Sequence, residues 1–216
     1  MTPNTPTIPL GNIDEDGRSE RKDAAANRKL ILETAETLFA KKGVANVCMA
    51  EIAQAANVGK GTLYRRYANK SELCLALMDT QMITFQNDML AQFRSMSANR
   101  VPQMAQLEFF IDALVHFTEA HSPLLSEVQS AGLLQENRST EMPHFWQYMT
   151  INGLFQAAIE AKEIPAGLDT EYLSDAILAP LKVDIFRFQR EVRGFSLERI
   201  SEGLRVLIAG LRHCVD

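Results

Sequence analysis

The chain has 216 residues, of which 46% are hydrophobic and 23% charged, and its formal net charge is −5. These proportions are ordinary for a globular protein, and no apolar run approaches the roughly 20 residues that a membrane-spanning helix needs. Three widely spaced cysteines indicate neither a disulfide framework nor a zinc site, and the first residues lack the apolar stretch of a secretion signal. Alternating strand-forming residues are nearly absent, so we expect a cytoplasmic, all-helical protein without metal or cofactor.

The first part of the chain predicts a tail followed by three helices. Residues 1–21 are rich in Pro, Thr, Gly and Asp without a hydrophobic period, which is typical of a disordered tail. A helix is expected over 23–42, where apolar residues recur on one face and Gly43 supplies the stop. Two short helices follow over 49–56 and 60–67, joined by a tight turn. This arrangement is that of a helix-turn-helix.

The rest of the chain predicts six further helices. They are expected at residues 69–96, 102–120, 123–135, 141–162, 170–193 and 196–213. The breaks fall at Pro123, at 137–140, at 164–167 and at Gly194, and Pro180 predicts a kink. We therefore expect about nine helices in two folded parts, with residues 22–69 as a helix-turn-helix domain and residues 70–216 as a larger helical domain.

Charge is spread unevenly along the chain. Between residues 18 and 75 there are eleven basic and six acidic residues, whereas residues 76–216 carry eleven basic and eighteen acidic ones. A basic N-terminal quarter on an acidic body is typical of a DNA-binding module attached to a second domain, although chance can produce the same asymmetry.

The second short helix carries the residues that could contact DNA. Leu63 and Tyr67 are four residues apart, so both can pack inward against the preceding helices. Outward positions then hold three bases, a hydroxyl and a phenol, from Lys60, Thr62, Tyr64, Arg65 and Arg66. Arg and Lys can bond guanine edges or phosphates, and Thr and Tyr can bond phosphates. A solvated basic helix is the alternative, which the preceding helix and turn make less favourable.

The stretch from Asn27 to Leu73 resembles the N-terminal domain of the TetR family of bacterial regulators. The matching residues keep a fixed order without gaps: Ala35, Leu38, Phe39, Gly43, Ile52, Ala53, Ala56, Val58, Lys60, Gly61, Thr62, Leu63, Tyr64, Tyr67, Lys70 and Leu73. The resemblance implies three DNA-binding helices, a long fourth helix and a helical domain for ligand binding and dimerisation. It also implies DNA contacts from Lys60, Gly61, Thr62, Tyr64, Arg65, Arg66 and Lys70, the last of these to a phosphate.

Three residues depart from the usual pattern of the family. Cys48 stands where Ser or Thr usually caps the second helix, which weakens that cap by roughly 1 kcal/mol. Gly59 replaces the Ser that often caps the recognition helix, at a cost of only a few tenths of a kcal/mol. Asn57 replaces the usual turn glycine but tolerates the left-handed conformation. None of these changes breaks the motif.

The last two predicted helices carry long apolar stripes. The resemblance implies that these helices pair with their twins in a dimer, so the residues expected at the interface are Ile177, Leu181, Ile185, Leu204, Leu207, Ile208 and Leu211. The alternative is that both stripes complete the core of a single chain. A two-fold dimer would present two recognition helices to a near-palindromic operator.

Most Met and Phe residues, and the single Trp, lie after residue 75, where they could line an adaptable apolar pocket or form ordinary core. His116, Trp146 and Met149 are the residues expected at such a pocket, whose effector would be apolar or amphipathic. Enzyme motifs are absent, and the four histidines lack metal-ligand spacing. We expect a repressor released from DNA by a small ligand. An activator, a regulator that answers a protein partner and a helical adaptor remain open as alternatives, and an enzyme is the least favoured.

Overall fold

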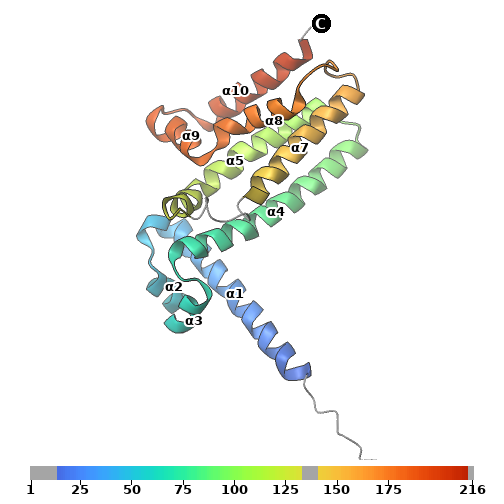
Figure 1. The fold of residues 1–216 in the computed structure, drawn as a ribbon. Helices are drawn as coiled ribbons and strands as arrows, with labels where there is room; N and C mark the ends of the chain where they lie inside the picture. The colour runs from blue at the N-terminus through green and yellow to red at the C-terminus, as the bar shows by residue number, and fades with distance from the viewer. Residues whose placement is uncertain (1–13, 133–140, 214–216) are drawn as a thin grey trace, which may run out of the picture. The chain divides into compact units, whose positions relative to one another are not determined.

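The computed structural model describes the backbone of residues 14–132 and 141–213 and the side chains of residues 24–132 and 145–212. Every regular element in these ranges is helical, which confirms the all-α prediction (Figure 1). The α-helices of the described ranges are α1 (Asp14–Lys42), α2 (Met49–Ala55), α3 (Lys60–Arg66), α4 (Lys70–Ala98), α5 (Gln103–Ser130), α7 (Glu141–Glu160), α8 (Thr170–Leu178), α9 (Val183–Arg187) and α10 (Leu197–Gly210). None of these helices combines the length and apolar character needed to cross a membrane.

Helix α1 begins at Asp14, whereas the sequence predicted a tail up to residue 21 and a helix from Asp23. Acidic residues favour the first turn of a helix because they face the positive end of its dipole, and positions 14–16 are all acidic. Residues 1–13 of the expected tail lie outside the described residues. The other end of α1 was predicted correctly, since Gly43 adopts a left-handed φ of 80°.

Helix α5 runs unbroken through Pro123, where the sequence predicted a boundary between two helices. A proline inside a helix removes one N–H donor and crowds the carbonyl four residues earlier. Figure 1 shows α5 changing direction towards its C-terminal end. Leu124 and Val128, which follow the proline, are both buried. Packing of this kind offsets the cost of about 3 kcal/mol for proline in a helix.

Pro180 has the opposite effect, because the helix predicted over 170–193 is divided there. After a short 3₁₀ turn, Lys182 is extended, with φ −60° and ψ 137°, and α9 begins at the next residue. Because Lys182 is extended, the side chains of α9 do not continue the hydrophobic period of α8. As a result Phe186 is fully buried, while Ile185, which a continuous stripe would have turned inward, is 39% exposed.

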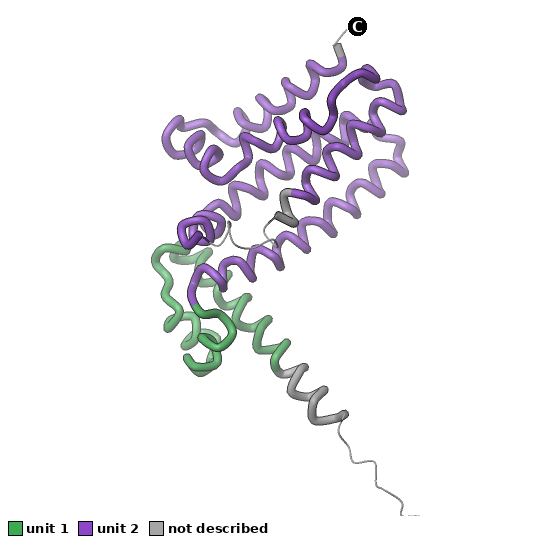
Figure 2. The backbone as a smooth tube through the Cα atoms, in the orientation of Figure 1, with its two compact units in different colours: residues 1–68 green, residues 69–216 purple. Residues whose placement is uncertain are grey.

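The chain forms two compact units, residues 1–68 and residues 69–216 (Figure 2). In unit 1, α1 packs against α2 and α2 packs against α3. An ion pair between Lys42 and Glu51 also joins α1 to α2. The buried apolar residues of this unit are Ile31, Leu32, Ala35, Phe39, Val44, Val47, Met49, Ile52, Ala53, Ala56, Leu63 and Tyr67.

Helix α5 is the central element of unit 2, since it packs against α4, α7, α9 and α10. Its Phe110 belongs to the same hydrophobic core as Phe155 of α7 and Phe186 of α9, and all three side chains are fully buried. Burying a side chain of this size contributes about 1.5–3 kcal/mol before the entropy of ordering it is subtracted. Residues of α4, α5 and α7 therefore share one well-packed core, which fixes the positions of these helices relative to one another.

Replacing Cys48 by serine is expected to stabilise the protein by about 1 kcal/mol. Cys48 occupies the N-cap of α2 with extended backbone (φ −108°, ψ 158°) and makes no side-chain capping bond. A serine hydroxyl could accept a hydrogen bond from the Glu51 N–H, which lies three residues on, as in a capping box. Urea unfolding of the full chain measures the effect. Cys48→Ala is the control, and equal stability of the Ser and Ala variants would contradict the prediction.

Candidate functional site

The turn between α2 and α3 is built around Asn57, whose φ of 52° confirms the predicted left-handed conformation. The Val58 N–H donates to the Ala53 carbonyl at 3.0 Å, and the Asn57 N–H donates to the Gln54 carbonyl at 3.1 Å. This pair of bonds is a Schellman motif, which satisfies carbonyls left open at the end of α2. Gly59 follows with extended backbone as the N-cap of α3. The turn thus starts the second helix within a few residues of the first.

Two apolar side chains determine which face of α3 turns inward. Leu63 is fully buried and Tyr67, one helical turn later, is 6% exposed. The sequence predicted both positions. The other face of the helix carries the exposed Lys60, Gly61, Tyr64, Arg65 and Arg66 and the half-buried Thr62.

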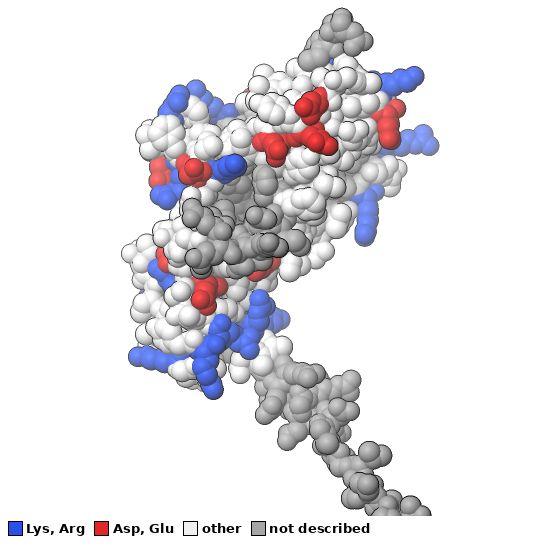
Figure 3. All heavy atoms as spheres, viewed as in Figure 1, with Lys and Arg blue, Asp and Glu red and all other residues white. Residues whose placement is uncertain are grey.

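The exposed face of α3 carries cationic charge that the described part of the chain does not neutralise. Lys60, Arg65 and Arg66 have no ion-pair partner among the described residues, and the guanidinium of Arg65 only donates a 3.4 Å hydrogen bond to the Thr62 hydroxyl. In Figure 3, Lys and Arg side chains gather at the end of unit 1 where Figure 1 places α3. A cluster of unneutralised cations on a short exposed helix is suited to a polyanion such as the DNA backbone.

Gly61 leaves open space on the same face. A Cβ atom added at Gly61 would meet no atom of the chain within 4 Å, so internal packing does not require glycine there. Glycine also permits close approach of the backbone to a bound molecule. Its position beside Lys60 and Thr62 is therefore compatible with a partner that approaches α3 closely.

Lys70 is held differently from the six residues of α3 that are expected to contact DNA. It is the first residue of α4, and its ammonium lies 3.4 Å from the Glu127 carboxylate of α5. The Ser71 hydroxyl donates to the same carboxylate at 3.1 Å. Burial, and next the Glu127 charge, raise the pKa of the nearby Cys74 thiol to about 12, which keeps it protonated and unreactive at neutral pH.

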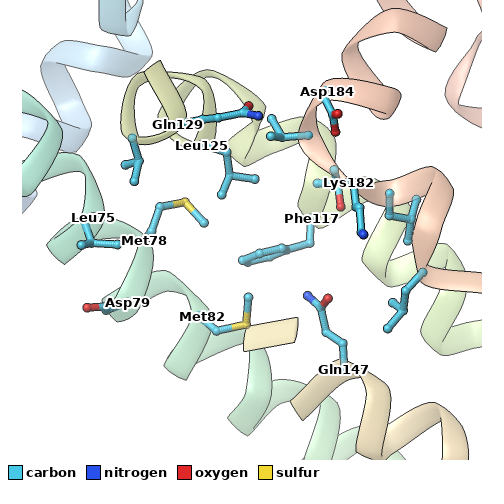
Figure 4. A pocket seen from close by; sticks show the side chains of 15 residues that line it. Leu75, Met78, Asp79, Met82, Phe117, Leu125, Gln129, Gln147, Lys182 and Asp184 are labelled. Atoms are coloured by element: carbon cyan, nitrogen blue, oxygen red, sulfur yellow. The ribbon is translucent and has the colours of Figure 1, made fainter. Parts of the chain in front are cut away.

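Unit 2 contains a pocket of about 320 Å³ between α4, α5, α7 and the segment that joins α8 to α9 (Figure 4). Its walls are mainly apolar, with a few polar and charged groups, which is the usual composition of a small-molecule site. The lining residues include Met78 and Met82 of α4, Phe117 of α5, Gln147 of α7 and Lys182. Met78 and Met82 are four residues apart, so they share one face of α4, which is a local signal for this pocket in the sequence.

The three residues expected at a pocket do not line this one. His116 is exposed and lies 3.8 Å from the Asp112 carboxylate, and Met149 is 49% exposed. Trp146 packs into the core, with its ring centroid 5.6 Å from that of Phe110. The pocket instead takes the residues next in sequence, Phe117 and Gln147. Neighbouring residues on a helix point about 100° apart, so a one-residue difference separates pocket from surface or core.

The apolar stripes expected at a dimer interface mostly serve the core of the single chain. Ile177, Leu204 and Ile208 are at most 5% exposed, and Leu181 and Leu211 are partly buried against the same core. Of the expected interface residues, only Ile185 and Leu207 are exposed, at 39% and 61%. The middle of each stripe therefore faces α5 and its neighbours within the single chain, and the dimer interface itself stays a prediction.

Other apolar side chains of this region are exposed, and sequence reasoning missed them. Together with Ile185 and Leu207 they form a set that we call the exposed C-terminal apolar residues: Ile185, Phe188, Val192, Val206 and Leu207. The spacings of three and four residues between Ile185, Phe188 and Val192 are the sequence signal for this second apolar face.

Comparison with known proteins gives consistent results. Residues 31–77 match the family of bacterial regulatory proteins, tetR family. An HTH-type transcriptional regulator of Staphylococcus aureus (strain bovine RF122 / ET3-1) is 29% identical over 178 residues, which span 82% of this chain and 90% of the relative. The chain is thus similar to a helix-turn-helix regulator over most of both lengths.

Two solved structures share the fold. A protein from Saccharomonospora viridis assigned as a transcriptional regulator, in complex with choline, has a TM-score of 0.68 at 16% identity and covers 86% of this chain and 96% of its own. NalD, the secondary repressor of the MexAB-OprM multidrug efflux pump in Pseudomonas aeruginosa, has a TM-score of 0.56 at 20% identity, with coverage of 87% and 96%. At these identities the likeness shows the fold alone.

Proposed function

This chain belongs to the TetR family of bacterial helix-turn-helix transcriptional regulators, and from that premise we propose that it is a cytoplasmic repressor. It binds a near-palindromic operator as a dimer and is released when a small ligand fills the pocket of unit 2. The observation that carries the DNA-binding part is the exposed face of α3, where Lys60, Arg65 and Arg66 lack ion-pair partners in the described chain. A repressor is proposed and not an activator because NalD, a structural neighbour, is a repressor.

The residues of α3 would contact different parts of the DNA. Lys60, Arg65 and Arg66 reach base edges or phosphates, and Thr62 and Tyr64 bond the backbone and nearby bases. Gly61 lets the duplex approach. Lys70 would bind a phosphate beside or in place of its Glu127 partner, because its ammonium carries three N–H donors.

Dimerisation would use the exposed C-terminal apolar residues. Several large apolar side chains on the last segments of a chain are costly in water and are typical of an interface. Two-fold pairing presents the same surface of each protomer and brings two α3 helices to successive major grooves. Buried residues such as Leu204 would support this surface from below without contacting the partner.

Ligand release would follow from linkage. If the ligand and the operator favour different arrangements of the dimer, each weakens the binding of the other by the same factor. The pocket of about 320 Å³ supports a small-molecule effector over a protein partner. The complex of the Saccharomonospora viridis protein with choline shows that a chain of this fold can accept a small molecule.

A gel shift with the DNA that flanks the gene of this protein tests the proposal. Binding to a palindromic segment is expected, with an affinity that falls steeply between 50 and 200 mM salt, because each cationic contact with a phosphate releases a counterion. Shuffled DNA of the same composition is the control. Equal affinity for both DNAs, or no binding at low salt, would contradict a sequence-specific repressor and would favour a helical protein without a DNA role.

A further inference from the structure

We propose that the pocket of unit 2 takes an anionic amphiphile, a small acid with an apolar tail, whose acidic group is bound by Lys182. This inference rests on the proposed function, in which the same pocket holds the effector. It names the chemical class of that effector from the side chains that line the pocket.

The two ends of the pocket differ in polarity. One end is lined mainly by apolar side chains from α4 and α5, including Leu75, Met78, Met82 and Leu125, with Asp79 and Gln129 beside them. The other end carries Lys182, and Figure 4 shows its ammonium and the Gln147 amide pointing towards the ring of Phe117. Such a division fits a ligand with an apolar tail and one polar group.

Lys182 is the basic residue of the described pocket lining, and none of the described carboxylates lies within ion-pair distance of it. It precedes α9 in extended conformation, so its side chain does not lie on a helix face beside residues three or four positions away. Lys182 is an exposed residue whose ammonium reaches the wall of a mainly apolar pocket, so an acid that binds there gains a charge-assisted hydrogen bond.

Two carboxylates also line the pocket, so a cationic ligand is the competing possibility. Figure 4 shows the Asp79 carboxylate pointing away from Phe117, and Asp79 already has a partner within the chain. Asp184 lies in the same view on the other side of Lys182 from Gln147. The charged group directed at the cavity is therefore the ammonium of Lys182, and the Gln147 amide, which carries both a donor and an acceptor, can bind an acid through its N–H.

Binding of three probes with the same ten-carbon tail tests the charge preference: decanoate, 1-decanol and decyltrimethylammonium. The fluorescence of Trp146, the single tryptophan, reports binding, because its ring contacts Phe85, whose centroid lies 4.5 Å from that of Phe117 in the pocket wall. Decanoate is expected to bind at least about tenfold more tightly than either other probe, as one charge-assisted hydrogen bond allows. Tighter binding of decyltrimethylammonium would overturn the proposal.

Lys182→Gln should weaken decanoate binding about tenfold and leave decanol binding within about twofold. Lys182→Arg should retain most of the decanoate affinity, and Asp184→Asn should increase it, because the variant removes a negative charge near the bound acid. Lys41→Gln, which removes an exposed lysine from unit 1, is the matched control. Unchanged decanoate affinity in Lys182→Gln would overturn the role of Lys182.

Decanoate should also release the wild-type protein from its operator at concentrations that leave Lys182→Gln bound. The fluorescence titration uses DNA-free protein, and the gel shift for the proposed function uses ligand-free protein. Loss of DNA binding with normal decanoate binding would contradict the repressor alone. Normal operator binding without any preference for decanoate would contradict the ligand class alone.

Discussion

Replacing Arg65 and Arg66 together by alanine will weaken operator binding by about a hundredfold or more. Each phosphate or base contact of this type contributes about 1–3 kcal/mol, and in a two-fold dimer the change removes every such interaction twice. The salt dependence should also become shallower, by roughly one unit of slope for each phosphate that the variant no longer binds. Gel shifts or anisotropy titrations at several salt concentrations measure both effects.

The folded state should survive this double change. Both arginines are exposed, and the interaction that the change removes within the described chain is the weak 3.4 Å hydrogen bond from Arg65 to Thr62. Arg94→Ala, which removes an exposed guanidinium from α4, is the control and should leave the affinity and the salt slope unchanged. An unchanged slope in the double variant, with its melting temperature intact, would show that the exposed face of α3 does not bind DNA.

Replacing Phe188 and Leu207 together by glutamate will convert the proposed dimer to a monomer at micromolar concentrations. The two side chains are 50% and 61% exposed in the single chain, and in the proposed dimer they would be covered. A carboxylate buried at an interface without a partner costs several kcal/mol, and two-fold symmetry places four of them there. Light scattering coupled to size exclusion should then give the mass of one chain, 24.2 kDa.

Operator affinity should fall together with the dimer, since one recognition helix cannot use both half-sites. Ile83→Glu places the same new charge at an exposed apolar residue of α4 and should leave the protein dimeric. Leu204→Ala provides a second comparison. Because Leu204 is buried in the core of the chain, its truncation should lower the free energy of unfolding by about 2–5 kcal/mol without first dissociating the dimer. A Phe188→Glu/Leu207→Glu variant that stays dimeric would place the interface elsewhere.

Much of unit 1 could be predicted because its signals are local. Gly43 and Asn57 end their helices in the left-handed conformation, and each effect lies within a few residues of its cause. Leu63 and Tyr67 are one turn apart on a helix that they themselves anchor, so the exposed face of α3 follows from spacing alone. The earlier start of α1, at Asp14, is the part of this unit where the predicted bounds were wrong.

Unit 2 was harder to predict because two prolines with the same local signal have different outcomes. The helix continues through Pro123, which is followed by the buried Leu124, but it is interrupted at Pro180. The chemistry of proline is the same in both places. Packing on either side decides whether the helix continues, and packing depends on residues that are distant in sequence.

The sequence by itself determined that the protein is all-helical and that α3 presents Lys60, Arg65 and Arg66 to solvent, since hydrophobic period and helix caps act over one or two turns. The tertiary structure alone decided which apolar residues face inward and which line the pocket. Lys182 lines that pocket because its own extended backbone, just before α9, places it beside residues of α5 and α7. The hydrophobic period of a helix shows that one of its faces is apolar. Whether that face contacts the core, a ligand or a partner depends on helices that are distant in sequence and meet only in the folded chain.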